Sequence, residues 1–127
     1  MKKLFATSIL LLLPSSAFAK CELDLYVFYG VVRDVNGKVA SGADVEISYR
    51  DNVWYEPHIV KTRADGMGYY KMALKYHPYS GNSGEGDECE AVLKSVDVVV
   101  TYKSKPDQFV AKVVQGNITN INFRVKR

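Results

Sequence analysis

The stretch from Phe28 to Ile47, FYGVVRDVNGKVASGADVEI, limits the possible folds of this chain more than any other. A β-branched run ends at Asp34, and the Asn36-Gly37 pair that follows adopts positive φ at low cost, which is typical of a tight turn. Beyond the turn, apolar residues alternate with polar ones, as in a strand with one buried and one solvated face, at Ala43, Val45 and Ile47. The stretch therefore predicts two strands joined by a polar turn.

Helix signals are almost absent after residue 19, because β-branched and aromatic residues come in short runs separated by Gly, Asn, Asp and Pro. We expect an all-β chain of about seven strands, antiparallel-rich and arranged as a β-sandwich. The expected strands cover residues 23–35, 43–48, 58–63, 69–75, 96–102, 109–114 and 120–125. Turns are expected at 65–68, 104–108 and 115–119, and a surface loop at 77–89, which is rich in Gly, Ser and acids.

The first expected strand is long, and Gly30 in its middle predicts a β-bulge or a close approach of another backbone segment. A bulge would switch the register of the strand, and its inward side is ambiguous because apolar residues occupy both alternating sets, at Leu23, Leu25, Val27, Val31 and Val32. Three successive valines at 98–100 predict a strand covered on both faces. Pro106 is expected in a turn, where its missing N–H costs nothing.

The first 19 residues have the features of a secretory signal. Lys2 and Lys3 precede an apolar run, and small residues follow it, so we expect cleavage after Ala19. The run is well short of the roughly 20 residues that span a bilayer, so no membrane span is expected in the mature chain. A lipid anchor on Cys21 is disfavoured, because Lys20 rather than a small residue precedes it.

The mature chain, residues 20–127, is expected in the periplasm of a bacterium or secreted from it, and its length suits one domain with a single core. Losing the two lysines of the leader leaves 15 basic against 14 acidic residues with interspersed signs, a pattern that does not favour nucleic-acid binding. In an oxidising compartment Cys21 and Cys89 are expected to form a disulfide. In the chain-entropy model this closure stabilises the fold by about 4 kcal/mol.

Most of the mature chain follows a pattern of glycine, aspartate and apolar residues: Gly30-x-Val32-x-Asp34-x-x-Gly37, Gly42-Ala43-x-Val45-x-Ile47, Thr62, Asp65-x-x-Gly68-x-Tyr70-x-Met72 and Asn120-x-Asn122-Phe123-x-Val125. This pattern resembles the carboxypeptidase regulatory-like family, whose domains are transthyretin-like (prealbumin-like) β-sandwiches of Greek-key type. The chain departs from the family at Val39, where a proline is common, and in a longer insertion at 77–88. The resemblance implies a fold and says little about function, because its glycines serve turns and its apolar positions serve the core.

Candidate catalytic residues are few. The transthyretin-like hydrolase of purine breakdown uses histidines, an arginine and a Tyr-Arg-Gly-Ser ending, whereas this chain offers only His58 and His77 and lacks that ending. Neither histidine has an evident orienting partner, so both are expected at the surface, and their spacing does not support an iron site of two histidines and a tyrosine. No catalysis, cofactor or metal is expected, and the acids of the 77–90 region, which do not match a calcium loop, are expected to be solvated: Glu85, Asp87, Glu88 and Glu90.

Aromatic residues are better candidates for function, since the chain has nine tyrosines and one tryptophan. Trp54 and Tyr55 stand in a polar loop, and Tyr76 and Tyr79 flank the insertion, where exposed aromatic rings are common anchors for proteins and sugars. A Trp54 ring that caps one end of the sandwich is an equally good interpretation. The predicted function is an exported, noncatalytic binding module whose partner is another envelope or secreted protein. The alternatives are a carbohydrate-binding or adhesion module, a periplasmic immunity or inhibitor protein, and a divergent transthyretin-like hydrolase.

Overall fold

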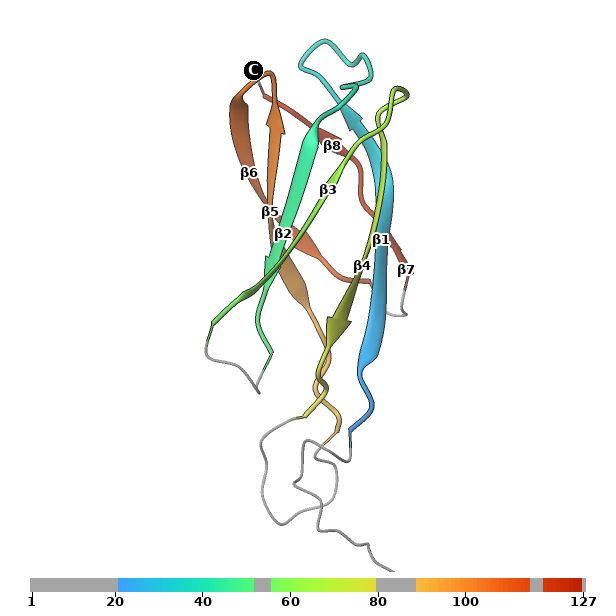
Figure 1. Cartoon of the computed structure of the whole chain (residues 1–127), viewed down its shortest axis with the longest axis vertical. Coiled ribbons are helices and arrows are strands. Elements are labelled where there is room, and N and C mark those ends of the chain that lie inside the picture. Colours follow the sequence, from blue (N-terminus) through green and yellow to red (C-terminus); the bar gives the residue numbers. More distant parts are fainter. Residues whose placement is uncertain (1–20, 52–55, 80–88, 115–117, 127) are drawn as a thin grey trace, which may run out of the picture.

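The structure, a computed structural model, describes residues 21–51, 56–79, 89–114 and 118–126. In those ranges the chain forms eight strands and no helix, and the strands make two four-stranded sheets packed face to face (Figure 1). The expected all-β, antiparallel-rich sandwich is therefore confirmed, with one strand more than the seven expected. The same ranges contain no helix long and apolar enough to cross a membrane.

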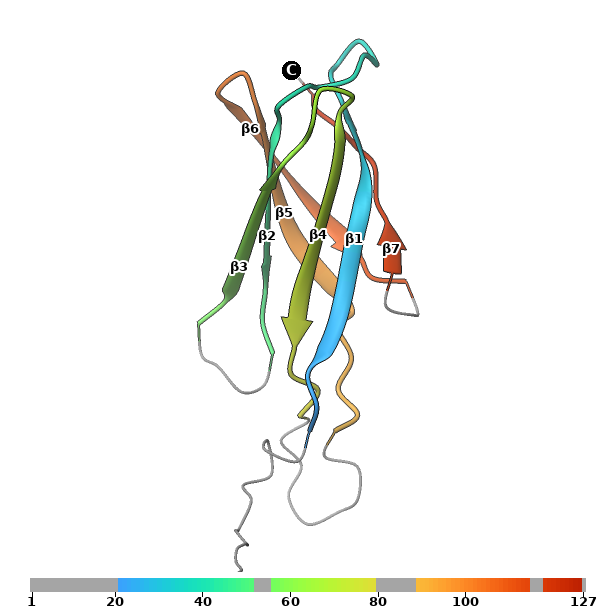
Figure 2. The same cartoon turned by 45° about the vertical axis from the view of Figure 1, so that its right-hand side comes forward.

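The first sheet has the order β4-β1-β7 (Figure 2), and β8 also pairs with β1. β1 (Asp24–Arg33) and β4 (Tyr69–Tyr76) are antiparallel, whereas β7 (Ile118–Asn120) and β8 (Phe123–Arg124) run parallel to β1. The single closing strand expected at 120–125 is thus wrong, since the chain leaves the ladder at residues 121–122 and rejoins it at Phe123.

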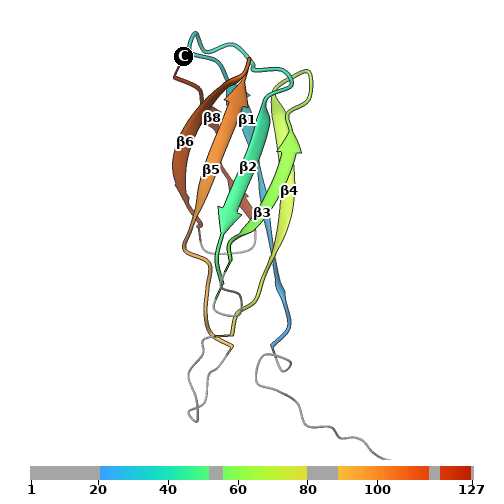
Figure 3. The same ribbon diagram turned by 60° about the vertical axis from the view of Figure 1, so that its left-hand side comes forward.

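The second sheet has the order β3-β2-β5-β6 and is antiparallel throughout (Figure 3). Its strands are β3 (His58–Arg63), β2 (Asp44–Tyr49), β5 (Ser95–Tyr102) and β6 (Lys105–Lys112). The expected turn at 104–108 is wrong, because Lys103 and Ser104 alone turn the chain with φ of 53° and 66°. Pro106 therefore lies inside β6, and an edge strand tolerates a residue without an N–H.

The ambiguity of β1 is resolved without a bulge. Its pairing with β4 is unbroken from Asp24↔Tyr76 to Val31↔Tyr69, so the even positions face the core along the whole strand. The sequence left the inward side open, and the structure turns the odd positions outward, so that Leu23 and Leu25 are exposed.

Gly30 is instead the point where another backbone segment approaches, which confirms the second expectation for this residue. A Cβ at Gly30 would stand 2.0 Å from the carbonyl oxygen of Ile121. The same oxygen accepts a hydrogen bond of 2.6 Å from the Tyr70 hydroxyl, and Asn122 Oδ1 accepts one of 2.8 Å from the Val31 amide. The interruption between β7 and β8 is held in place by these bonds.

Between the sheets lies a core of side chains that are almost fully buried, among them Phe28, Val32, Val45, Ile47, Leu74, Val96, Val98, Val100 and Val125. The alternation predicted for β2 and β4 is confirmed by the burial of Val45, Ile47, Tyr70, Met72 and Leu74. The expectation that β5 is covered on both faces is wrong, because Val99 between two buried valines is only half buried on the outer face.

Two turns use the same side-chain device. Asp34 Oδ1 accepts hydrogen bonds from the amides of Asn36 and Lys38, and Asp65 Oδ1 accepts them from Met67 and Tyr69. Each turn ends in a glycine with positive φ, Gly37 or Gly68. An aspartate whose side chain accepts hydrogen bonds from amides a few residues further along the chain is a common turn former. Both turns could therefore be predicted from the sequence.

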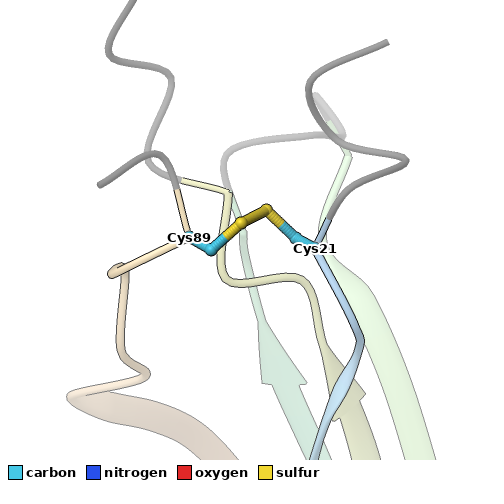
Figure 4. Close-up of a disulfide and its surroundings, with 2 residues drawn as sticks. All are labelled: Cys21 and Cys89. Carbon is cyan, nitrogen blue, oxygen red and sulfur yellow. A yellow bond between two sulfur atoms is a disulfide. The ribbon is translucent and has the colours of Figure 1, made fainter. Parts of the chain in front are cut away.

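The expected disulfide between Cys21 and Cys89 is present, with a Cα–Cα distance of 5.5 Å across 68 residues of sequence (Figure 4). It joins the segment that enters β1 to the segment that leads to β5, and so links the two sheets at one end of the sandwich. Such a bond is typical of proteins from oxidising compartments.

Candidate binding face

Strand β1 is apolar on both of its sides, and only one side is covered. Its even positions enter the core, whereas the odd positions Leu25, Val27, Tyr29 and Val31 lie on the outer face of the first sheet. Leu25 is 48% exposed and Tyr29 is 43% exposed, and the two valines are half buried. A strand that is apolar on both faces is usually covered on both.

The neighbouring strands extend this surface sideways, as the pairing register shows. On β4, Ala73 stands opposite Val27 and Tyr69, 56% exposed, stands opposite Val31. On β7, Ile118, which is 66% exposed, pairs with Val27. The term apolar face is used below for the outward set Leu25, Val27, Tyr29, Val31, Tyr69, Ala73 and Ile118. No other described strand covers the outer side of this sheet, which fronts the molecule in Figure 2.

The charged side chains at the described outward positions of this sheet all have a positive sign. Lys71 and Lys75 project from β4 opposite Tyr29 and Leu25, and Arg33 pairs with Arg124 where β1 meets β8. Among the described residues, the outward positions of β1, β4, β7 and β8 include no Asp or Glu, and no ion pair joins these four cations to a described carboxylate.

The guanidinium groups of the two arginines donate to backbone carbonyls of the 34–38 turn, Arg33 to Gly37 and Arg124 to Val35. These bonds hold the two arginines at that end of the face, and neither arginine forms an ion pair with a described carboxylate.

The outer face of the second sheet has the opposite character. Asp44 pairs with Arg63 at 3.0 Å and Glu46 with Lys61 at 3.8 Å, and these residues line a shallow groove over β2 and β3. Two exposed apolar residues of this face, Ile59 and Val110, lie on the opposite edge strands β3 and β6 and are therefore separated. Since both signs alternate on this sheet, the apolar face with its uncompensated cations stands out.

A cluster of polar side chains lies around Asp51, at the end of the sandwich where the disulfide is. This carboxylate, with its side chain 2% exposed, lies 3.4 Å from His58 Nε2 and accepts a hydrogen bond of 3.3 Å from the His77 amide. The ring of Tyr49 stacks on His58, and its hydroxyl donates to the Lys75 carbonyl of the other sheet. These contacts connect the two sheets, because β2 and β3 belong to one and β4 to the other.

The Asp51 charge also acts on the tyrosines of this end. Burial, in first place, and then the negative charge of Asp51 raise the pKa of both Tyr49 and Tyr76 above the usual value. Both phenols consequently stay neutral at physiological pH.

Of the four residues predicted as a binding surface, the structure describes Tyr76 and Tyr79, and neither is exposed. Trp54 and Tyr55 lie outside the described residues. Tyr76 is buried and contacts Tyr26 edge to face at 5.9 Å, so its proposed exposure is wrong, since the even register of β4 turns it inward. Tyr79 is half buried.

The candidate metal and catalytic residues have a mixed outcome. Both histidines are half buried, and His58 has the carboxylate partner Asp51 that the sequence did not reveal. Of the acids weighed for calcium, Glu90 is exposed, and Glu85, Asp87 and Glu88 lie outside the described residues. Among the residues that the structure describes, no group of three or more His, Cys, Asp or Glu side chains is placed to hold a metal.

Sequence reasoning missed the apolar face, although a signal for it was present. The odd positions Leu25 and Val27 are apolar in the sequence, and a strand with two apolar sides explains them without a bulge at Gly30. Tyr29, Tyr69 and Ile118 could not be assigned to one surface without the register that pairs their strands.

The fold and this surface define a β-sandwich with one apolar, cation-rimmed outer face, and comparisons with known proteins support the fold. No family model and no curated protein match the chain, so membership of the carboxypeptidase regulatory-like family stays a prediction. Among solved structures, the chain is similar to chlorocatechol 1,2-dioxygenase from Pseudomonas putida, with a TM-score of 0.58, 14% identity and coverage of 84% of this chain and 62% of that one.

A 9R-lipoxygenase from Cyanothece is also similar, with a TM-score of 0.46 and 14% identity, over 94% of this chain and 18% of that one. The chain thus spans less than two thirds of either enzyme. At such identity the likeness to the dioxygenase concerns the fold alone and does not extend to its activity.

Proposed function

We propose that this protein is an exported binding module that contacts another protein through the apolar face. The observation that carries the proposal is the difference between the two outer faces, one ion-paired and polar and the other apolar with uncompensated cations. Exposed contiguous apolar surface with a polar rim is the usual mark of an interaction site. The proposal includes export, consistent with the disulfide, and membership of the carboxypeptidase regulatory-like family.

Tyr29 is the expected anchor of this contact. It lies on the central strand, between Lys71 on β4 and Asn120 on β7, and Tyr69 on β4 is its diagonal neighbour. Tyrosine is enriched among the residues that dominate binding energy, because its ring offers a large contact area with a polar tip. We therefore place the centre of the binding site at Tyr29.

The size of the face suits a modest interface. From Leu25 to Arg33 the strand extends ~27 Å, and three strands are ~14 Å wide, which gives a footprint on the order of 400 Å². A standard interface buries about 800 Å² on each partner, so the face alone would support a transient contact or the centre of a larger one.

Site-specific photocrosslinking in the producing cells tests the proposal. A benzophenone side chain replaces Tyr29 on the apolar face, and the control places the same group at Gln108, an exposed position on the outer face of β6. One discrete protein adduct from position 29 and none from position 108 is the expected result. Equal yields from both positions, or no adduct at position 29, would refute the proposal.

A divergent hydrolase is the second candidate, because Asp51 and His58 form the carboxylate–histidine pair that acid–base catalysis uses. The pair predicts hydrolysis of small esters such as nitrophenyl acetate that His58→Ala and Asp51→Asn each abolish. Turnover that is absent from the purified protein, or unchanged in both variants, removes this candidate.

A further inference from the structure

We infer that the partner surface that meets the apolar face carries carboxylates along two of its sides, an inference that rests on the function proposed above. The four cations of the face frame its apolar residues on one long edge and at one end. Lys71 and Lys75 lie along β4, which is the edge strand of the sheet, and Arg33 and Arg124 lie where β1 meets β8. A partner that covers the apolar residues must therefore place charge opposite these two sides.

Covering the face with a neutral partner would be costly. The cations lie beside side chains that the contact would remove from water, and a charge that loses water needs a partner charge or hydrogen bonds. Since no described carboxylate of the face can supply that charge, the partner has to do so. Asp and Glu are the side chains that match Lys and Arg at an interface rim.

The same pattern argues against a second copy of this chain as the occupant. A twofold contact covers the face with a second copy of itself, and the described outward positions of that copy offer no acid to compensate the cations. Cations that lose water without gaining a partner charge are unfavourable at an interface. The face therefore selects a different, acidic protein.

Charge reversal at the edge of the face tests this inference. Lys71→Glu and Lys75→Glu are introduced together into the protein that carries the benzophenone at position 29, and the matched control is Lys112→Glu, an exposed lysine on β6 of the other sheet. We expect the double variant to lose about tenfold in adduct yield and the control to stay within about twofold of the parent, because rim charges control association. Raising the salt from 50 to 500 mM should lower the parent yield and leave the double variant little changed.

The outcomes separate the two proposals. An adduct that forms equally in the parent and in the double variant overturns the acidic partner while the binding function stands. Absence of any adduct from the parent overturns the binding function itself. Unchanged thermal midpoints of the two variants ensure that a lost adduct reports on contact and not on folding.

Two further measurements test the other possible binding partners of the apolar face, a second copy of this chain and a lipid surface. Sedimentation velocity of the purified protein at low and high salt should show a monomer, and a dimer that Tyr29→Asp abolishes would overturn the inference. Flotation with vesicles of phosphatidylcholine and phosphatidylglycerol should leave the protein unbound, and binding that Lys71→Glu with Lys75→Glu abolishes would identify a lipid surface instead of an acidic protein.

Discussion

Replacing Gly30 by alanine should destabilise this fold more than the same replacement at any other described glycine. The new Cβ would stand 2.0 Å from the Ile121 oxygen, 2.7 Å from its carbonyl carbon and 2.9 Å from Asn122 Oδ1. Two of these atoms are backbone and cannot rotate away, so the segment between β7 and β8 has to move by more than about 1 Å to reach ordinary contact distance.

Three hydrogen bonds depend on the present position of that segment. The Tyr70 hydroxyl donates to Ile121 O at 2.6 Å, the Ile121 amide donates to Tyr29 O at 2.9 Å, and the Val31 amide donates to Asn122 Oδ1 at 2.8 Å. Overpacking costs about 1–3 kcal/mol, and each weakened hydrogen bond adds roughly 1 kcal/mol. We expect a total loss of about 4–6 kcal/mol, a large share of the roughly 5–15 kcal/mol that stabilises a typical domain.

Urea unfolding followed by intrinsic fluorescence measures this loss. With a typical slope of about 1–3 kcal/mol per molar urea, the midpoint of Gly30→Ala should fall by at least about 1 M. Gly66→Ala is the matched control, because a Cβ there meets no atom within 4 Å and its φ is not in the positive region, so its midpoint should change little. If the two variants unfold at the same urea concentration, the contact between a Cβ at position 30 and the Ile121 carbonyl does not destabilise the fold, and the prediction is refuted.

Three further predictions follow from other parts of the fold. The double variant Lys103→Asn with Ser104→Gly should stabilise the protein by about 1 kcal/mol, measured as a higher thermal midpoint, because both residues now occupy the left-handed region in a two-residue hairpin turn; a lower midpoint would contradict this. Removing the disulfide with Cys21→Ala and Cys89→Ala should cost about 2–5 kcal/mol, and dithiothreitol should lower the midpoint of the parent but not of the variant. Burial raises the pKa of Tyr70, so the stability that this side chain contributes is present below the ordinary tyrosine pKa of about 10 and is lost as the pH rises above that value. Tyr70→Phe should therefore reduce the loss of stability at alkaline pH. An identical pH profile of stability in the parent and the variant would contradict this prediction.

The local features of this fold could be predicted because neighbouring residues alone decide them. The Asp34 and Asp65 side chains bind amides two and four residues further on, and the alternation of β2 and β4 repeats within a single strand. The disulfide was also predictable, since the chain has two cysteines and therefore one possible intramolecular pairing. None of these predictions required knowledge of which strands are neighbours.

The sequence by itself therefore determined an all-β chain with two aspartate-held turns, one disulfide and a strand apolar on both sides. Only the tertiary structure decided which of those two sides is covered, because pairing with β4, β7 and β8 sets which positions of β1 meet the core. It likewise turned Tyr76 inward, placed Asp51 beside His58, and collected Tyr29, Tyr69 and Ile118 on one surface. These residues are far apart in the chain, and a surface made of side chains from three strands exists only once the register between those strands is set.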